Sequence, residues 1–261
     1  MANYSEKSRA SYEHLWKSKE GEKTKRQLDW SYQQFRIHLA IFRLLRSSDM
    51  KPNIILEIGC GSGAFLKRIG REIKGKMIIG LDFSKTAIMK AKSVNRLREN
   101  VILIVGDATK LPFRSNAFDL LIASEVLEHL AGLDKKRCIY EANRVLKTKG
   151  LFILSTPNPR SITLFLSNLL LKITHPFASI HPFKKNFSNQ PIEEWIHDIH
   201  TLLSPFFDTE EIACMHACAV YTIPFSHLFP FCIPKILSEY IEDRNLIQKL
   251  GLYYIVEAKS A

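Results

Sequence analysis

The stretch IILEIGCGSGA, residues 54–64, decides the fold of this chain. The apolar run at residues 53–58 is typical of a buried strand, and three glycines (Gly59, Gly61 and Gly63) follow where a helix begins. Glycine has no Cβ, so the backbone can pass close to a bound ligand. The first turn of a helix also presents oriented N–H groups. The stretch therefore predicts a strand, a ligand-binding loop and a helix.

The same alternation of strand and helix continues along the chain. Apolar runs predict strands at residues 76–81, 101–105, 118–123 and 151–154, with a helix at 84–98 capped by Ser84 and another from Asp134 to Gly150. Two final strands are predicted at residues 206–213 and 252–258. This order predicts an α/β, doubly wound, mostly parallel sheet of seven strands covered on both faces. Ligands bind such sheets at the carboxyl ends of the strands.

Three segments are expected from the pattern. Residues 1–48 form an N-terminal helical cap whose apolar stripe is Ile37, Ile41, Leu44 and Leu45. Residues 49–158 form the ligand-binding core. Residues 159–261 form a lid rich in Phe, Leu and Ile, with a helical stripe at 192–203, a helix at 235–246 and the last two strands.

Composition excludes several classes of protein. The chain has 261 residues, of which 46% are hydrophobic, so it has enough apolar surface to fold. Its five cysteines form no C-x-x-C pair, and Cys214 and Cys218 flank His216 without a second ligand pair, so no metal site is expected. So few cysteines also predict a reducing, cytoplasmic setting. The polar start of the chain predicts no secretory signal.

One apolar stretch raises the question of a membrane. Residues 212–234 carry no Asp, Glu, Lys or Arg, and the stretch is long enough to span a bilayer. Pro224, Pro230 and Pro234 would break a spanning helix, so we expect a strand, a loop and a helix start instead. Whether this stretch touches a membrane surface stays open.

The net charge of +11 is concentrated in the middle of the chain. Residues 51–150 carry 19 basic and 10 acidic side chains. The basic side chains fall on predicted helix surfaces without interleaved aromatics, so nucleic acid is not expected as a partner. A solvated lysine-rich surface explains most of the charge, and weak attraction to anionic lipid headgroups is the alternative.

Acidic residues follow the first three predicted strands. Gly59, Gly61 and Ala64 satisfy the dinucleotide pattern G-x-G-x-x-G/A, but Glu57 at the end of the strand would repel a pyrophosphate and suits an ammonium group instead. Asp82 can accept the two hydroxyls of a ribose, which does not distinguish NAD from S-adenosylmethionine. Asp107 can accept an adenine amino group.

Five ordered motifs now resemble a known family. They are E-x-G-C-G-x-G at residues 57–63, G-x-D-x-S at 80–84, G-D-A-x-x-L-P-F at 106–113, F-D-x-x-x-x-x-E-V-L-E-H-L at 118–130 and R-V-L-K-x-x-G at 144–150. Together they resemble class I S-adenosylmethionine-dependent methyltransferases, and most closely the small-molecule type that includes the ubiquinone and menaquinone enzymes. The resemblance covers residues 50–158 and implies a Rossmann-like sheet. The ending at 251–258 is similar to its antiparallel last strand.

The resemblance also implies the roles of individual residues. S-adenosylmethionine would be the cofactor, with its methionine part held by Glu57, Gly59, Cys60, Gly61 and Gly63. The ribose would be bound by Asp82, the adenine surrounded by Phe83, Asp107 and Ala108, and the sulfonium approached by Ser124 and Glu125.

The expected reaction is an in-line methyl transfer to a small acceptor. We expect a hydrophobic, lipid-linked or quinone-like acceptor, met in the cytoplasm or at the inner face of the membrane. His129, just after the fourth strand, is the candidate base for an oxygen acceptor, with a purely structural role as the alternative. No Asn/Asp-Pro-Pro-Tyr sequence follows that strand, which by resemblance disfavours methylation of nucleic-acid nitrogen.

Two other functions remain as alternatives. One is a catalytically silent S-adenosylmethionine-fold module that binds at a membrane surface, and the other is a nicotinamide-dependent oxidoreductase. The methylated atom, whether oxygen, carbon or nitrogen, and the oligomeric state stay open.

Overall fold

The computed structural model describes residues 10, 13, 17, 25–47, 50–73, 76–95, 99–158, 196, 198–207, 213–217 and 253–260. Its elements are α2 (Lys25–Ser47), β1 (Ile54–Ile58), α3 (Ala64–Glu72), β2 (Met77–Asp82), α4 (Lys85–Asn95), β3 (Val101–Val105), β4 (Phe118–Ser124), η2 (Leu127–His129), α5 (Gly132–Val145), β5 (Leu146–Pro157), α7 (Ile199–Leu203), β6 (Ala213–Ala217) and β7 (Tyr253–Lys259).

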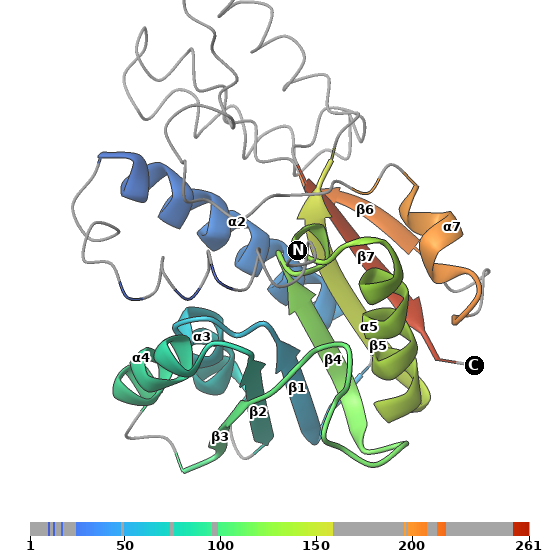
Figure 1. Ribbon diagram of the computed structural model, residues 1–261, viewed down its shortest axis with the longest axis horizontal. Helices are drawn as coiled ribbons and strands as arrows, with labels where there is room; N and C mark the ends of the chain where they lie inside the picture. Colours follow the sequence, from blue (N-terminus) through green and yellow to red (C-terminus); the bar gives the residue numbers. More distant parts are fainter. Residues whose placement is uncertain are drawn as a thin grey trace, which may run out of the picture.

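The strands form one twisted sheet between helices (Figure 1). Their order is β3-β2-β1-β4-β5-β7-β6, so the chain starts near the middle and winds outward in both directions. β1 to β5 pair in parallel, and β7 runs antiparallel to both β5 and β6. The predicted α/β, Rossmann-like sheet with an antiparallel last strand is therefore confirmed.

Alternation along each strand sends side chains to two separate cores. Leu56 and Ile58 of β1 pack on one face with α5 and α7, whereas Ile55 packs on the other face with α2, α3 and α4. Both faces are thus covered, which explains why the parallel strands are apolar at nearly every position.

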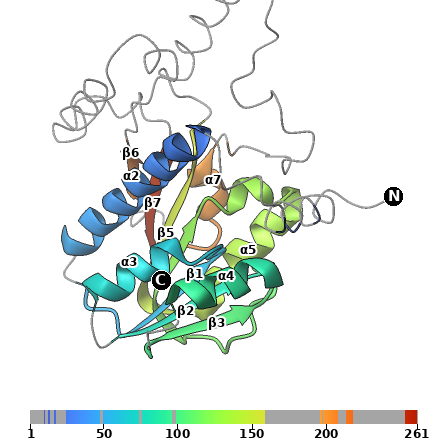
Figure 2. The same cartoon turned by 90° about the vertical axis from the view of Figure 1, so that its left-hand side faces the viewer.

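Helix α2 belongs to one of these layers. Ile37, Ile41 and Leu44 from its predicted apolar stripe are buried, and Phe42 lies 5.4 Å from the ring of Phe65 in α3. In Figure 2, α2 and α3 lie along the same face of the sheet. The described part of the predicted N-terminal segment therefore covers the sheet. The segment boundaries at residues 48 and 158 stay predictions.

The strand predicted at residues 206–213 is wrong. Phe206 and Phe207 lie in the turn that follows α7, and the strand is Ala213–Ala217. The ring of Phe207 is buried and stacks on Phe152 at 5.5 Å, so this apolar pair fills the core from a turn. Of the helix predicted at 192–203, α7 covers Ile199–Leu203, whereas Ile196 and Asp198 lie before the helix begins. The helix predicted at 235–246 lies outside the described residues.

The bounds predicted for α5 are also corrected. Asp134 does not cap the helix, because its N–H already donates to the Ala131 carbonyl and its carboxylate pairs with Arg137 in the first turn. At the other end the helix stops at Val145 rather than Gly150, because Leu146 already pairs with Phe118 of β4.

No helix in the described part of the chain is long and apolar enough to cross a membrane. Of the apolar stretch at residues 212–234, only residues 213–217 are described, and they form β6.

Candidate functional site

The functional side chains gather where parallel strands end. Glu57 of β1 lies in register with Gly80 of β2 and Ile122 of β4. Because side chains alternate along a strand, Glu57, Asp82 and Ser124 continue the rows that face α2, α3 and α4. Figure 1 shows the carboxyl ends of β1, β2 and β4 at one edge of the sheet. The topology therefore brings together residues that are far apart in sequence.

The glycine loop is hydrogen-bonded to the end of β2. The N–H groups of Gly59 and Cys60 donate to the Leu81 carbonyl at 2.7 and 3.0 Å. Gly59, Gly61 and Gly63 have φ of 70°, 50° and 76°, which side chains disfavour. A Cβ on Gly59 would also lie 2.4 Å from Cγ2 of Val126, in the turn after β4. A side chain at position 59 would therefore clash with Val126, and the close approach of a ligand to this backbone stays a prediction.

Glu57 has a buried carboxyl oxygen without a hydrogen bond from any described residue. Its side chain is 4% exposed, and Oε2 has no hydrogen-bond partner among the residues that the structure describes. Burial and the neighbouring negative charge of Asp82 raise the pKa of Glu57 well above its ordinary value. A positively charged ligand group beside this carboxyl would lower its pKa, against the effect of Asp82, and would give Oε2 a hydrogen-bond partner.

Asp82 joins the glycine loop to the next helix. Its Oδ2 accepts a hydrogen bond from the Gly61 N–H and its Oδ1 accepts one from the Ser84 N–H, both at 2.9 Å. Burial raises the pKa of Asp82 despite these two bonds. Each carboxylate oxygen retains a further lone pair, so Asp82 can still accept ligand hydroxyls.

Glu13 is a neighbour of this site that the sequence did not identify. Its carboxylate accepts hydrogen bonds from the hydroxyl of Ser84 and from that of Thr86, the latter at 2.6 Å. Ser84 also caps α4 as predicted, since its Oγ accepts from the Ala87 N–H at 3.1 Å. The two residues that Glu13 contacts lie 71 and 73 positions further along the chain, and no local sequence pattern links such distant positions.

Asp107 follows β3 and closes a turn of its own. Its Oδ1 accepts from both the N–H and the hydroxyl of Thr109 at 2.8 Å. Ala108 packs against the α5 side of the core, and Phe83 at the end of β2 is half-buried. These residues stand beside the ends of β2 and β3.

After β4 the chain bends sharply. Glu125 has φ of 57°, which is uncommon for a residue other than glycine. Its N–H donates to the Ser155 carbonyl at 3.1 Å, and its Oε1 accepts from the Ser155 hydroxyl at 3.3 Å. Ser124 and Ser155 have their hydroxyl oxygens 3.0 Å apart. The bend is therefore fixed by the end of β5.

His129 lies at the end of η2, and its side chain is 18% exposed. Burial and the positive charge of Lys135 lower the pKa of His129 to about 3, so its imidazole is neutral at physiological pH. Its Nε2 lies 3.8 Å from Oε1 of Glu128. Glu128 is buried and also accepts a hydrogen bond from the Thr156 hydroxyl at 3.2 Å. The sequence signal for Glu128 was an acid within the apolar run E-V-L-E-H-L.

The site joins a carboxyl group suited to a cation, a second carboxylate and a loop of three glycines at one sheet edge. Glu57, the glycine loop and Asp82 form one connected unit, whereas Ser124, Glu125 and His129 occupy the next strand end. The buried Oε2 atom and the glycine cradle fit a ligand that carries both an ammonium group and a ribose, such as S-adenosylmethionine.

Residues 56–154 match the family model described as a methyltransferase domain. Malonyl-(acyl-carrier protein) O-methyltransferase of Legionella pneumophila is 30% identical over 48% of this chain and 44% of its own length. Demethylmenaquinone methyltransferase of Thermotoga maritima is 30% identical over 50% of this chain and 56% of its own. The chain spans about half the length of the curated relatives it matches.

A solved structure has the same fold. The SAM-dependent methyltransferase of Archaeoglobus fulgidus superposes with a TM-score of 0.54 at 18% identity, over 85% of this chain and 92% of that one. The comparisons confirm the resemblance drawn from the five motifs: residues 56–154 form a methyltransferase domain. A probable S-adenosylmethionine-dependent methyltransferase of Mycobacterium tuberculosis is 30% identical over 53% of this chain and 47% of its own length.

Proposed function

We propose, from the methyltransferase domain at residues 56–154, that this protein transfers a methyl group from S-adenosylmethionine to a small hydrophobic or lipid-linked acceptor. The observation that carries the proposal is the buried, unpartnered Oε2 of Glu57 beside the glycine loop. A carboxyl group held dry at this place is costly unless a ligand cation completes it.

Each cofactor contact is assigned to a residue of this chain. Glu57 holds the ammonium group, and the backbone of Gly59 to Gly63, Cys60 included, approaches the methionine part. Asp82 accepts the ribose hydroxyls. Phe83, Asp107 and Ala108 border the adenine, and Ser124 and Glu125 form the floor near the reacting end. When bound, S-adenosylmethionine supplies a methyl group on a positively charged sulfur.

His129 is the proposed base for an oxygen acceptor. A neutral imidazole can take up a proton, but a pKa of about 3 makes it a weak base. An oxygen acceptor that displaces water and draws the imidazole toward Glu128 would raise this pKa, because a buried carboxylate favours the protonated ring. In this structure Nε2 of His129 and Oε1 of Glu128 are 3.8 Å apart, which is too far for a hydrogen bond.

The acceptor is proposed to bind between the N-terminal cap, residues 1–48, and the lid, residues 159–261. The lid is rich in Phe, Leu and Ile, and relatives are named for a malonyl-carrier and a demethylmenaquinone substrate. A quinone-like or lipid-linked acceptor fits that composition. We place the protein in the cytoplasm, with peripheral contact at the inner face of the membrane.

The testing experiment is calorimetric titration of the full chain with S-adenosylmethionine, S-adenosylhomocysteine and NAD. Binding of both adenosyl ligands in the micromolar range, without binding of NAD, supports the cofactor assignment. A labelled-methyl screen of quinone and lipid acceptors then tests transfer. Cofactor binding without transfer to any acceptor would favour the catalytically silent binding module, and absence of adenosyl binding would overturn the proposal.

A further inference from the structure

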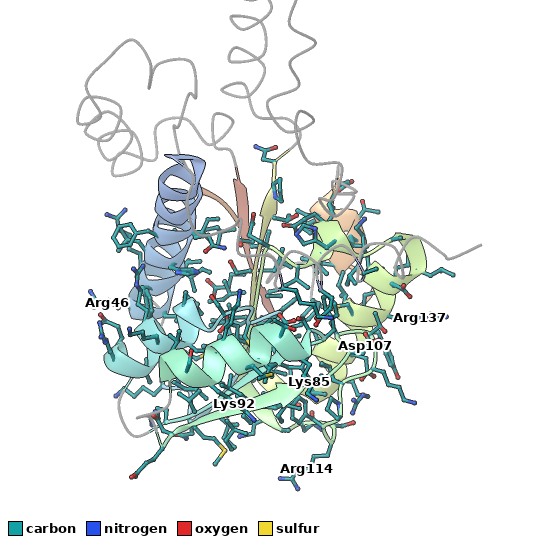
Figure 3. The ribbon with its side chains drawn as sticks, turned by 60° about the vertical axis from the view of Figure 1, so that its left-hand side comes forward. Arg46, Lys85, Lys92, Asp107, Arg114 and Arg137 are labelled. Carbon is teal, nitrogen blue, oxygen red and sulfur yellow. The ribbon has the colours of Figure 1, made fainter. Side chains whose placement is uncertain are left out.

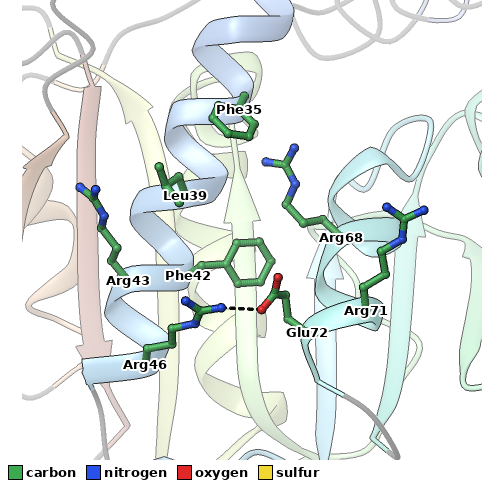
Figure 4. A pocket seen from close by; sticks show the side chains of 8 residues that line it. All are labelled: Phe35, Leu39, Phe42, Arg43, Arg46, Arg68, Arg71 and Glu72. Carbon is green, nitrogen blue, oxygen red and sulfur yellow. Dashed lines mark hydrogen bonds and ion pairs between the residues drawn. The ribbon is translucent and has the colours of Figure 1, made fainter. Parts of the chain in front are cut away.

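A separate groove of about 280 Å³ lies between α2 and α3 (Figure 4). Its lining residues are Phe35, Leu39, Phe42, Arg43, Arg46, Arg68, Arg71 and Glu72. None of the residues assigned above to the cofactor or to proton transfer lines it. The groove therefore calls for an explanation of its own.

Helix α2 contributes an apolar row to the groove, beside Arg43 and Arg46 of the same helix. Phe35, Leu39 and Phe42 follow one another at helical spacing along it. Phe42 is buried, whereas Phe35 is 41% exposed. The groove thus has an apolar wall that ends in an exposed aromatic ring.

The rest of the lining is strongly basic. Four arginines and one glutamate give it a net charge of +3. The single acid, Glu72, is already engaged, because its Oε2 lies 2.6 Å from Nη2 of Arg46. No salt bridge to Arg68 or Arg71 is formed among the described residues. In Figure 4 both guanidinium groups extend from α3 beside the groove, with Arg68 toward Phe35.

Arg68 is held in place rather than extended into water. Its Cζ lies 4.5 Å from the centroid of the Phe35 ring, a cation–π contact that fixes the guanidinium plane. Partial burial lowers the pKa of Arg68, and the negative charge of Glu72 opposes this shift. An anion in the groove would supply a further counter-charge.

The chemistry of the lining selects a particular ligand. Guanidinium groups match phosphate oxygens with paired, parallel hydrogen bonds. The adjacent apolar wall suits hydrocarbon, and an exposed phenyl ring beside basic side chains is typical of a surface that enters a membrane interface. The net charge of +11 would draw the whole chain toward an anionic surface.

We propose that the α2–α3 groove binds the headgroup phosphate of an anionic phospholipid, with Arg68 and Arg71 on the phosphate and Phe35 entering the interface. The proposal rests on the membrane contact proposed above and gives it a location. Its readout is binding to vesicles, so its failure and the failure of methyl transfer are distinguishable.

The test measures partition of the full chain onto vesicles that contain phosphatidylserine in phosphatidylcholine, beside vesicles of phosphatidylcholine alone. The variant is Arg68→Gln with Arg71→Gln. Each basic side chain at an anionic surface strengthens binding about fivefold, so the double variant is expected to partition about 30-fold more weakly. Wild-type protein is expected to ignore pure phosphatidylcholine.

The matched control is Arg114→Gln with Arg137→Gln. It removes the same number of guanidinium groups from exposed positions that lie on the other side of the molecule from Arg46 in Figure 3. We expect the control to partition onto the phosphatidylserine vesicles less than threefold more weakly than the wild type. Equal losses in the two double variants would mean diffuse attraction and would overturn the proposal.

A second arm separates a lipid from a soluble ligand. Arginine side-chain NMR signals of the wild type are followed during addition of inorganic phosphate and, separately, of the vesicles. Perturbation of Arg68 and Arg71 by vesicles, abolished in the double variant with its thermal midpoint unchanged, supports the lipid site. Perturbation by inorganic phosphate without any vesicle binding would overturn it in favour of a soluble phosphate ester.

Discussion

The substitution Glu57→Gln separates the cost of a buried carboxyl from its use in binding. The amide has nearly the same shape but cannot ionise. In the wild type, burial and the charge of Asp82 raise the pKa of Glu57 in the folded state above its value in the unfolded chain. The folded protein therefore binds the Glu57 proton more tightly than the unfolded chain does.

The sign and size of the effect follow from this linkage. The stabilising contribution of Glu57 is complete below the unfolded pKa of about 4.3 and is lost as pH rises toward the folded pKa. Across that window the wild type loses up to about 1.4 kcal/mol of unfolding free energy per pH unit relative to the Gln variant. In a chain of this size that difference moves the thermal midpoint by about 3–6 °C per pH unit.

The assay is urea unfolding of both proteins at half-unit steps from pH 5 to pH 8. Groups that titrate identically in the two proteins cancel in the difference. The exposed substitution Glu99→Gln serves as the control and should give a constant difference from wild type. Parallel profiles for wild type and Glu57→Gln would refute the reasoning, because they would mean that Glu57 ionises as an ordinary carboxyl.

The same variant tests the ligand role. Losing a charge-assisted hydrogen bond should weaken S-adenosylhomocysteine binding about 10- to 100-fold in Glu57→Gln. Binding of S-adenosylhomocysteine to the wild type should also release the Glu57 proton. The measured calorimetric heat should then depend on the ionisation enthalpy of the buffer. A stabilised variant with undiminished affinity would show that Glu57 does not meet the ammonium group.

Three further predictions concern the loop, the sheet and the base. Gly59→Ala should lower the free energy of unfolding, measured in urea, by about 2–4 kcal/mol, because it combines a positive φ with a clash against Val126. Gly132→Ala, where the added Cβ meets nothing within 4 Å, should lower it by about 1–2 kcal/mol. Asp119, whose carboxylate accepts from Lys147 and two backbone N–H groups, has a lowered pKa, so its contribution is present above pH 4 and is lost as pH falls through the folded pKa. Asp119→Asn should abolish that part of the acid dependence, which a pH series of thermal midpoints measures, and an unchanged series would contradict the assignment. His129→Ala should lower turnover of an oxygen acceptor about 10²- to 10⁴-fold while S-adenosylhomocysteine affinity stays within about twofold, and equal turnover would eliminate the base role.

Much of the fold was predictable because its signals are local. The strand β1 and the loop to Gly63 were recognised from apolar runs ended by glycines, and the stripe of α2 from its helical spacing. The places of the candidate acids were predictable for the same reason: Glu57, Asp82 and Asp107 lie at or just past the ends of β1, β2 and β3. Their roles in cofactor binding stay predictions. Their assignment to S-adenosylmethionine rather than NAD came from the order of five motifs.

Other features could not be read from local pattern. The apolar pair Phe206 and Phe207 looks like the start of a strand, but its rings pack from a turn, and apolar residues serve both purposes. Leu146 continues a helical stripe, yet pairing with β4 draws it into a strand. Tertiary contacts decide such cases because they outweigh small differences in intrinsic preference.

The sequence by itself determined the parallel sheet, the glycine loop and the acids at the strand ends, since chain order and residue type impose them. Only the tertiary structure decided that Glu57 is buried with no described residue hydrogen-bonded to its Oε2, that Glu13 reaches Ser84, and that Arg68 faces Phe35 across a groove. The physical reason is common to all three. Burial, charge and contact depend on which segments meet in space, and the crossing of distant segments carries no signature in either one alone.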